Sequence, residues 1–166
     1  MEKGSNLRRI RLLILFFMAA LIVSGLTAVP LQWELRLLNQ IVNWQPLAAA
    51  WPGLAYWVAR VFFGLEDSYT RYPFLALGTD WLAFGHIAIA VAFFGPLRDP
   101  VRNRWVIEFG MIACILVVPW ALLFGALRGI PIFWRLVDTS FGVFGMIPLW
   151  ICRREIRRLE SLPISG

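Results

Sequence analysis

Four stretches of the chain are almost continuously apolar, and each is about as long as a bilayer is thick. A helix needs about 20 apolar residues to cross about 30 Å of hydrocarbon. The stretches lie near residues 10–30, 73–95, 105–127 and 132–152. They predict an all-α polytopic membrane protein, a four-transmembrane-helix bundle in which residues 1–166 form a single membrane domain.

Residues 31–72, between the first two predicted spans, follow a different pattern. From Leu54 onward, bulky apolar residues recur at the spacing of one helix face, at positions 54, 57, 58, 61 and 62. Four tryptophans also fall in this segment, and tryptophan concentrates at headgroup depth: Trp33, Trp44, Trp51 and Trp57. We expect an amphipathic interfacial segment on the outer membrane surface. The alternative is a re-entrant segment that lines a pathway.

The composition agrees with a membrane protein and gives it an orientation. Of the 166 residues, 60% are hydrophobic, which is more than a soluble domain of this length can bury. The net charge is +6, and most Lys and Arg residues fall before the first span, in the 96–104 loop and in the tail at 153–166. Basic residues favour the cytoplasmic side, so both termini should be cytoplasmic. This explains the basic excess without nucleic acid as a partner.

Two carboxylates fall inside predicted spans at matching depths. Asp80 and Asp138 each follow a proline, Pro73 or Pro131, by seven residues, which places both about 10 Å inside the outer boundary. A carboxylate in a membrane is costly and normally has a partner. Arg135 lies three residues before Asp138 on the same helical face. We predict an outer cluster of Asp80, Arg135 and Asp138, with further hydrogen bonds from Thr79, Thr139 and Ser140.

This outer cluster has two interpretations. The first is structural: polar contacts hold the second and fourth spans together, because lipid gives helices no hydrophobic reason to associate. The second is functional: two carboxylates and one arginine leave a net negative site, open to the outer side, that binds a cation or carries a proton.

His86 and Cys114 are expected at similar depths near the middle of the membrane. His86 is the candidate relay of a conducting pathway, and a neutral histidine that donates to a neighbouring helix is the simpler alternative. Zinc needs at least three protein ligands, and no third soft ligand is evident. Haem would find one axial ligand here, His86, and its second would come from another subunit or from a methionine. We therefore expect no metal and no cofactor.

Small residues and prolines mark expected packing positions in the spans. Gly78 and Gly85 in the second span, with Gly142 and Gly145 in the fourth, predict either close packing of these two helices or a homo-oligomeric face. Two prolines inside the third and fourth spans predict kinks or local loosening: Pro119 and Pro148.

The cytoplasmic side carries its own charge pattern. Glu108 follows Arg104 by four residues and should pair with it or with the arginine-rich tail. The stretch "ICRREIRRLE" predicts that the last span continues as a basic helix at the inner surface, where it suits anionic lipids. A protein partner fits equally well, and a homo-oligomer or a larger membrane complex stays open.

Enzyme signatures are absent from the sequence: it contains no H-E-x-x-H, no G-x-S-x-G and no P-loop. An enzyme is therefore disfavoured. At "YPFLALGTDWLAFGHIAIA", "GPLRDPVRNRWVIEFGMIAC" and "RGIPIFWRLVDTSFG" the chain resembles a family of small, uncharacterised bacterial four-span membrane proteins. The resemblance implies a bacterial inner membrane and no particular chemistry. Two functions remain, a structural or accessory membrane protein, or a small proton or cation channel or transporter that uses Asp80, Asp138 and His86.

Overall fold

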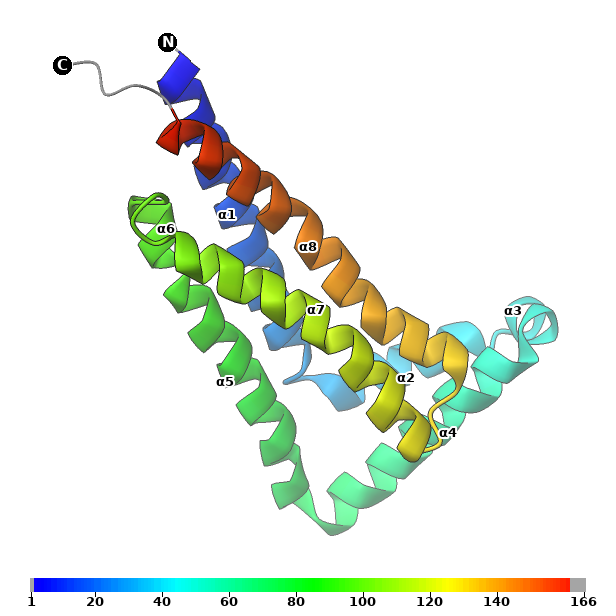
Figure 1. Ribbon diagram of the computed structural model, residues 1–166. Coiled ribbons are helices and arrows are strands. Elements are labelled where there is room, and N and C mark those ends of the chain that lie inside the picture. The colour runs from blue at the N-terminus through cyan, green and yellow to red at the C-terminus, as the bar shows by residue number, and fades with distance from the viewer. Residues whose placement is uncertain (1, 162–166) are drawn as a thin grey trace. The chain divides into compact units, whose positions relative to one another are not determined.

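The computed structural model describes residues 2–161, and every regular element in this range is a helix (Figure 1). In chain order the elements are α1 (Glu2–Thr27), α2 (Leu31–Val42), α3 (Gln45–Ala50), α4 (Pro52–Arg71), the 3₁₀ helix η1 (Pro73–Ala76), α5 (Leu77–Ala92), α6 (Phe94–Arg98), α7 (Arg104–Leu127) and α8 (Ile132–Glu160).

Four helical segments are long and apolar enough to cross a membrane, as the sequence predicts. They are Gly4–Thr27, Pro73–Arg98, Arg104–Leu127 and Ile132–Glu160. The first helix ends at Thr27 and not near residue 30, because residues 28–30 form a turn before α2 begins. The last helix continues unbroken to Glu160, which confirms that the basic stretch extends the final span as a helix.

The chain divides into two compact units. Unit 1 comprises Met1–Ala20 and Ile89–Gly166, and unit 2 comprises Leu21–Ala88. Long helices α1 and α5 each contribute to both units. A single membrane domain over the whole chain stays a prediction.

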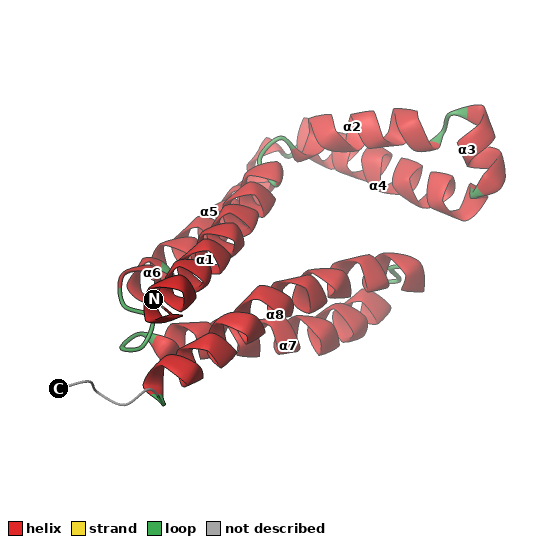
Figure 2. Ribbon diagram, turned by 90° about the horizontal axis from the view of Figure 1, so that it is seen from above, coloured by secondary structure: helices red, strands yellow, loops and turns green. Residues whose placement is uncertain are grey.

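Helices α7 and α8 form an antiparallel pair in unit 1 (Figures 1 and 2). The connection between them contains a left-handed glycine, Gly129, with φ 68°, two residues after α7 ends at Leu127. Beyond it the Ile130 N–H returns to the Gly125 carbonyl at 2.9 Å, which closes the helix end. Pro119 and Pro148 both lie inside helices that continue on either side of them.

The core of unit 1 is formed by buried side chains of several helices, and it lies near the ends of α1 and α8 that carry the chain termini. Phe17 of α1 and Phe93 pack with ring centroids 4.8 Å apart. The Cys152 thiol of α8 lies 3.8 Å from the Ile10 carbonyl oxygen of α1. The other fully buried apolar residues of this core are Ile14, Ile107, Leu149 and Ile156. On α8 these positions form a stripe at alternating three- and four-residue spacing, which is typical of helix packing.

Unit 2 contains a helical hairpin in which α2 and α4 lie side by side, with α3 at its tip (Figure 2). Val58 is almost fully buried, whereas Tyr56 and Phe63 on the opposite face are exposed. The expected stripe at positions 54, 57, 58, 61 and 62 is thus the inward face of α4, where every residue is buried or half-buried. An ion pair of 3.3 Å between Arg36 and Glu66 joins the two helices. That this hairpin lies on the outer membrane surface stays a prediction.

The glycines behave differently in the two spans for which they predicted close packing. A Cβ added to Gly142 would overlap the Cys114 carbonyl oxygen and come within 2.8 Å of Val117, so α8 packs tightly on α7 at this point. A Cβ added to Gly78 or Gly85 would meet nothing within 4 Å. Within unit 2, these two glycines therefore mark no close helix contact among the described residues. Gly25 does mark one, against His86, but it was not singled out from the sequence.

Candidate functional site

Arg135, the cation of the predicted outer cluster, is fastened to α7. Its aliphatic stem lies over Gly125, where an added Cβ would come within 2.6 Å of two stem carbons. Its Nη1 donates to the Leu122 carbonyl oxygen at 3.4 Å. The buried Nε has no hydrogen-bond partner among the described residues. One donor of this guanidinium is thus unsatisfied by the described residues.

The other unit 1 members of the outer cluster lie on the same helix, α8. Asp138 is half-buried, and no ion pair with a described residue of its unit is formed. The Thr139 hydroxyl donates to the Leu136 carbonyl oxygen at 2.8 Å, and the Ser140 hydroxyl donates to the Val137 carbonyl oxygen at 2.6 Å. Both hydroxyls are therefore used within the helix.

The remaining cluster residues belong to unit 2. Asp80 is exposed on α5 and borders a shallow hollow of about 260 Å³ whose other lining residues are Leu77, Trp81 and Phe84. The Thr79 hydroxyl donates to the Ala76 carbonyl oxygen at 2.8 Å and lies 3.4 Å from the Tyr69 hydroxyl. Because Asp80 and Arg135 belong to different units, their pairing stays a prediction.

The His86 side chain forms a hydrogen bond within its own helix, α5. Its Nδ1 lies 2.8 Å from the Leu82 carbonyl oxygen, and since a carbonyl only accepts, Nδ1 carries the proton. The sequence had favoured donation to a neighbouring helix. What lies against His86 is Gly25 of α1, where an added Cβ would come within 2.7 Å of the histidine Cβ. The close approach of two backbones explains why a small residue stands there.

Cys114 is a packing residue. Its sulfur lies 3.0 Å from the position of a Cβ at Gly145, and its carbonyl faces Gly142. Among the described residues, no group of three His, Cys, Asp or Glu side chains could hold a metal ion.

The feature that sequence reasoning missed is a buried carboxylate, Glu155 of α8. Its side chain is only 4% exposed and lies 3.5 Å from Arg9 of α1 and 3.0 Å from Arg158. Glu155 continues the buried stripe of α8, because it follows the fully buried Cys152 by three residues. This spacing was the available signal in the sequence.

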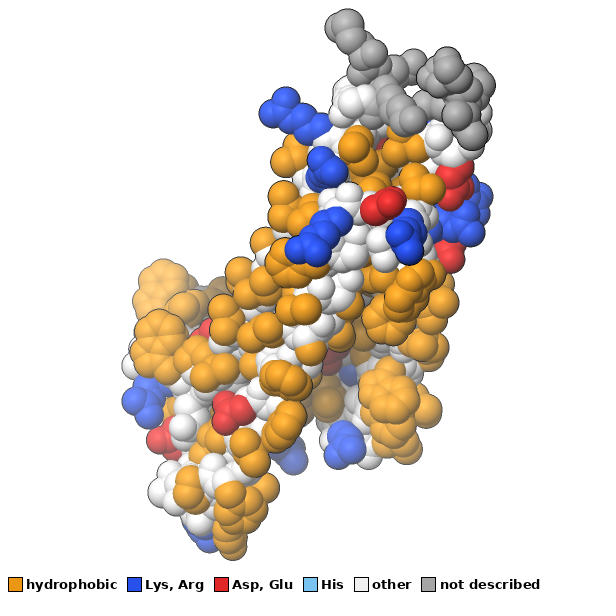
Figure 3. Space-filling view, turned by 90° about the vertical axis from the view of Figure 1, so that its left-hand side faces the viewer, with side chains coloured by type: hydrophobic (Ala, Val, Ile, Leu, Met, Phe, Trp, Pro, Cys, Tyr) orange, Lys and Arg blue, Asp and Glu red, His pale blue; other side chains and the backbone are white. Residues whose placement is uncertain are grey.

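A second set of ion pairs links α7 to the end of α8. Glu108 lies 3.5 Å from Arg104 and 2.7 Å from Arg153, so both of the pairings expected for it are present. Arg104 also donates to Glu160 at 2.9 Å. We call these residues, with Glu155, Arg9 and Arg158, the terminal charge network. In Figure 3, basic and acidic side chains lie close to one another near the top of the view, and other charged side chains are scattered lower down.

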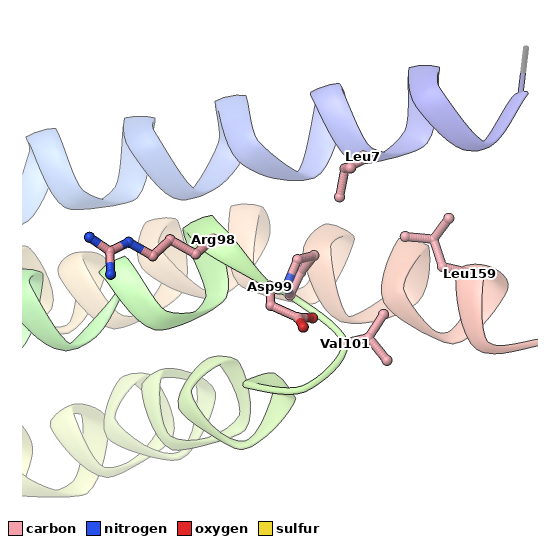
Figure 4. A pocket seen from close by; sticks show the side chains of 6 residues that line it. Leu7, Arg98, Asp99, Val101 and Leu159 are labelled. Carbon is pink, nitrogen blue, oxygen red and sulfur yellow. The ribbon is translucent and has the colours of Figure 1, made fainter.

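A hollow of about 420 Å³ lies beside this network. It is lined by Leu7, Arg98, Asp99, Pro100, Val101 and Leu159 (Figure 4). The Asp99 carboxylate accepts the Arg102 backbone N–H at 3.0 Å, which fixes the loop, and the Arg98 side chain extends away from Asp99. The carboxylate thus has a structural partner, and the residues that line the hollow include no histidine, cysteine, serine or lysine beside it.

Comparisons with protein-family models, with curated proteins and with solved structures give no match to this chain.

Proposed function

We propose that the protein is an integral membrane protein of structural or accessory type, an oligomer or a subunit of a larger membrane complex. The observation that carries this proposal is the terminal charge network. Glu155 is buried between arginines of α1 and α8, and Glu108 connects α7 to α8. Charged groups placed in this way hold helices together, which lipid alone does not do.

Arg135 supports the same role, because its hydrogen bond to the Leu122 carbonyl oxygen joins α8 to α7. The described hydrogen bonds of His86, Thr139 and Ser140 stay within their own helices. In the proposed arrangement, the Arg135 guanidinium also binds Asp80 and adds a second clamp in the outer half, between the second and fourth spans.

The location proposed for the protein is the bacterial inner membrane, with both termini in the cytoplasm. The distribution of basic residues supports the orientation, and the resemblance to small bacterial four-span proteins supports the compartment. The terminal charge network then lies at the cytoplasmic surface.

A second function, a small proton or cation channel or transporter, has one specific observation in its favour. Asp80 lies in an apolar span, is exposed, and borders a hollow. A carboxylate in that setting normally marks either a helix partner or an ion pathway. In the second case Asp80 and Asp138 bind the ion, and His86 relays it.

Flux measurements separate the two functions. Purified protein is reconstituted into liposomes, and proton and potassium fluxes are compared for the wild type, Asp80→Asn, and His86→Ala. A structural protein is expected to give fluxes equal to those of empty liposomes in all three samples. Wild-type flux that both substitutions abolish, with the variants still folded by circular dichroism, would reject the structural role in favour of the channel.

A further inference from the structure

Three arginines near the end of α8 surround a hollow of about 270 Å³. They are Arg153, Arg154 and Arg157, and the other lining residues are Met111 of α7 and Trp150 of α8. Arg154 lies over the Trp150 ring, with its guanidinium carbon 5.8 Å from the ring centroid. The hollow therefore has a cationic part and an apolar part.

Several guanidinium donors in the cationic part have no acceptor among the described residues. Arg153 uses its Nε on Glu108, at 2.7 Å, but its buried Nη1 has no hydrogen-bond partner among the described residues. Arg154 and Arg157 are exposed, and neither forms an ion pair with another described side chain. The exposed guanidinium groups of Arg154 and Arg157 can therefore donate charge-assisted hydrogen bonds to a phosphate oxygen in the hollow.

The hollow also lies at the boundary between the apolar and charged parts of both helices. On α8 the residues from Phe141 to Ile151 carry no charge, and the arginines begin at Arg153. On α7 no charged residue occurs between Glu108 and Arg128. Met111 and Trp150 thus lie on the apolar side of the boundary, and the arginines lie on the polar side. A phospholipid has the same order, with its phosphate above its acyl chains.

We propose that this hollow binds a phospholipid with an anionic headgroup. The phosphate lies among the three arginines, and the upper parts of the acyl chains cover Met111 and Trp150. Charge complementarity selects an anionic headgroup, because three arginines line the hollow and only Arg153 among them pairs with a described carboxylate, Glu108. This site is more specific than a general attraction of the basic tail to the membrane surface, and it rests on the proposed membrane location.

The test measures binding of dioctanoyl phosphatidylglycerol to the delipidated full-length protein in neutral detergent, by native mass spectrometry. The same experiment is run with dioctanoyl phosphatidylcholine and with inorganic phosphate. The variant Arg154→Gln/Arg157→Gln is compared with Arg8→Gln/Arg102→Gln, which removes two exposed arginines from the same end of unit 1 but not from the hollow. Circular dichroism establishes that each variant is folded.

Phosphatidylglycerol is expected to bind at least about tenfold more tightly than either phosphatidylcholine or inorganic phosphate. Arg154→Gln/Arg157→Gln is expected to weaken it about 30-fold, and the control pair less than about threefold. Equal losses in both pairs would overturn the site in favour of diffuse surface charge. Equal binding of inorganic phosphate would replace the lipid by a free anion, and equal binding of phosphatidylcholine would remove the headgroup selectivity. The wild-type comparisons hold even if a variant fails to fold, and none of these outcomes depends on the flux result.

Discussion

Replacing both Arg9 and Arg158 with glutamine is expected to lower the free energy of unfolding by about 3 kcal/mol, whereas Glu155→Gln costs only about 1 kcal/mol. The difference follows from which charge is buried. Glu155 is 4% exposed, while Arg9 and Arg158 are 60% and 53% exposed. Removal of the arginines leaves a buried carboxylate without compensation. Removal of the carboxylate leaves two arginines that water still solvates.

The stability of each variant is measured by titrating dodecyl sulfate into the protein in mixed micelles and following the loss of helix by circular dichroism. Arg8→Gln/Arg102→Gln is the control, because these arginines are exposed and neither pairs with a described carboxylate. It should change stability by less than about 0.5 kcal/mol. If Glu155→Gln costs as much as the arginine pair, the carboxylate is not the buried member that the network depends on.

Gly142→Ala is expected to destabilise the protein by about 2 kcal/mol or more, although it adds one methyl group. The new Cβ overlaps the Cys114 carbonyl oxygen and crowds Val117. A backbone oxygen cannot move aside as a side chain can, so α7 and α8 must separate. The same titration measures the loss.

Gly78→Ala makes a matched control, because the substitution is identical and also lies in a helix within an expected span. Nothing lies within 4 Å of the added Cβ. Alanine favours helix over glycine by about 1 kcal/mol, so this variant should be neutral or slightly stabilised. Similar destabilisation by the two variants would contradict the close approach of α8 to α7 at Gly142.

The parts of this fold that could be predicted are those that depend on the hydrophobic pattern of the sequence. Four apolar stretches predicted four helices of spanning length, and spacing from Leu54 predicted the inward face of α4, because both depend on local periodicity. Glycines in the spans predicted close helix packing, and this prediction holds only for those glycines that face a neighbouring helix of their unit. Gly142 does so and Gly78 does not, and the sequence holds no sign of the difference, which depends on the rotation of each helix in the fold.

The sequence predicted the local ion pairs of the candidate site but not the long-range ones. The pairing of Glu108 with Arg104 is a local, four-residue relation, and the structure contains it. The pair of Glu155 with Arg9 joins residues 146 positions apart, so no local pattern could indicate it. The bond of His86 to the Leu82 carbonyl oxygen lies within one helix, and the sequence does not indicate whether such a side chain bonds its own helix or a neighbouring one.

In the proposed topology the chain crosses the membrane four times and the terminal charge network lies in the cytoplasm. Single cysteines test it directly, in a background with Cys114→Ser and Cys152→Ala, through labelling of intact bacterial spheroplasts by a membrane-impermeant maleimide. Ser68→Cys between the first two spans should be labelled at once. Arg102→Cys and Ser161→Cys should be labelled only after the membrane is permeabilised. Labelling of Arg102→Cys or Ser161→Cys in intact spheroplasts, or protection of Ser68→Cys, would contradict this topology.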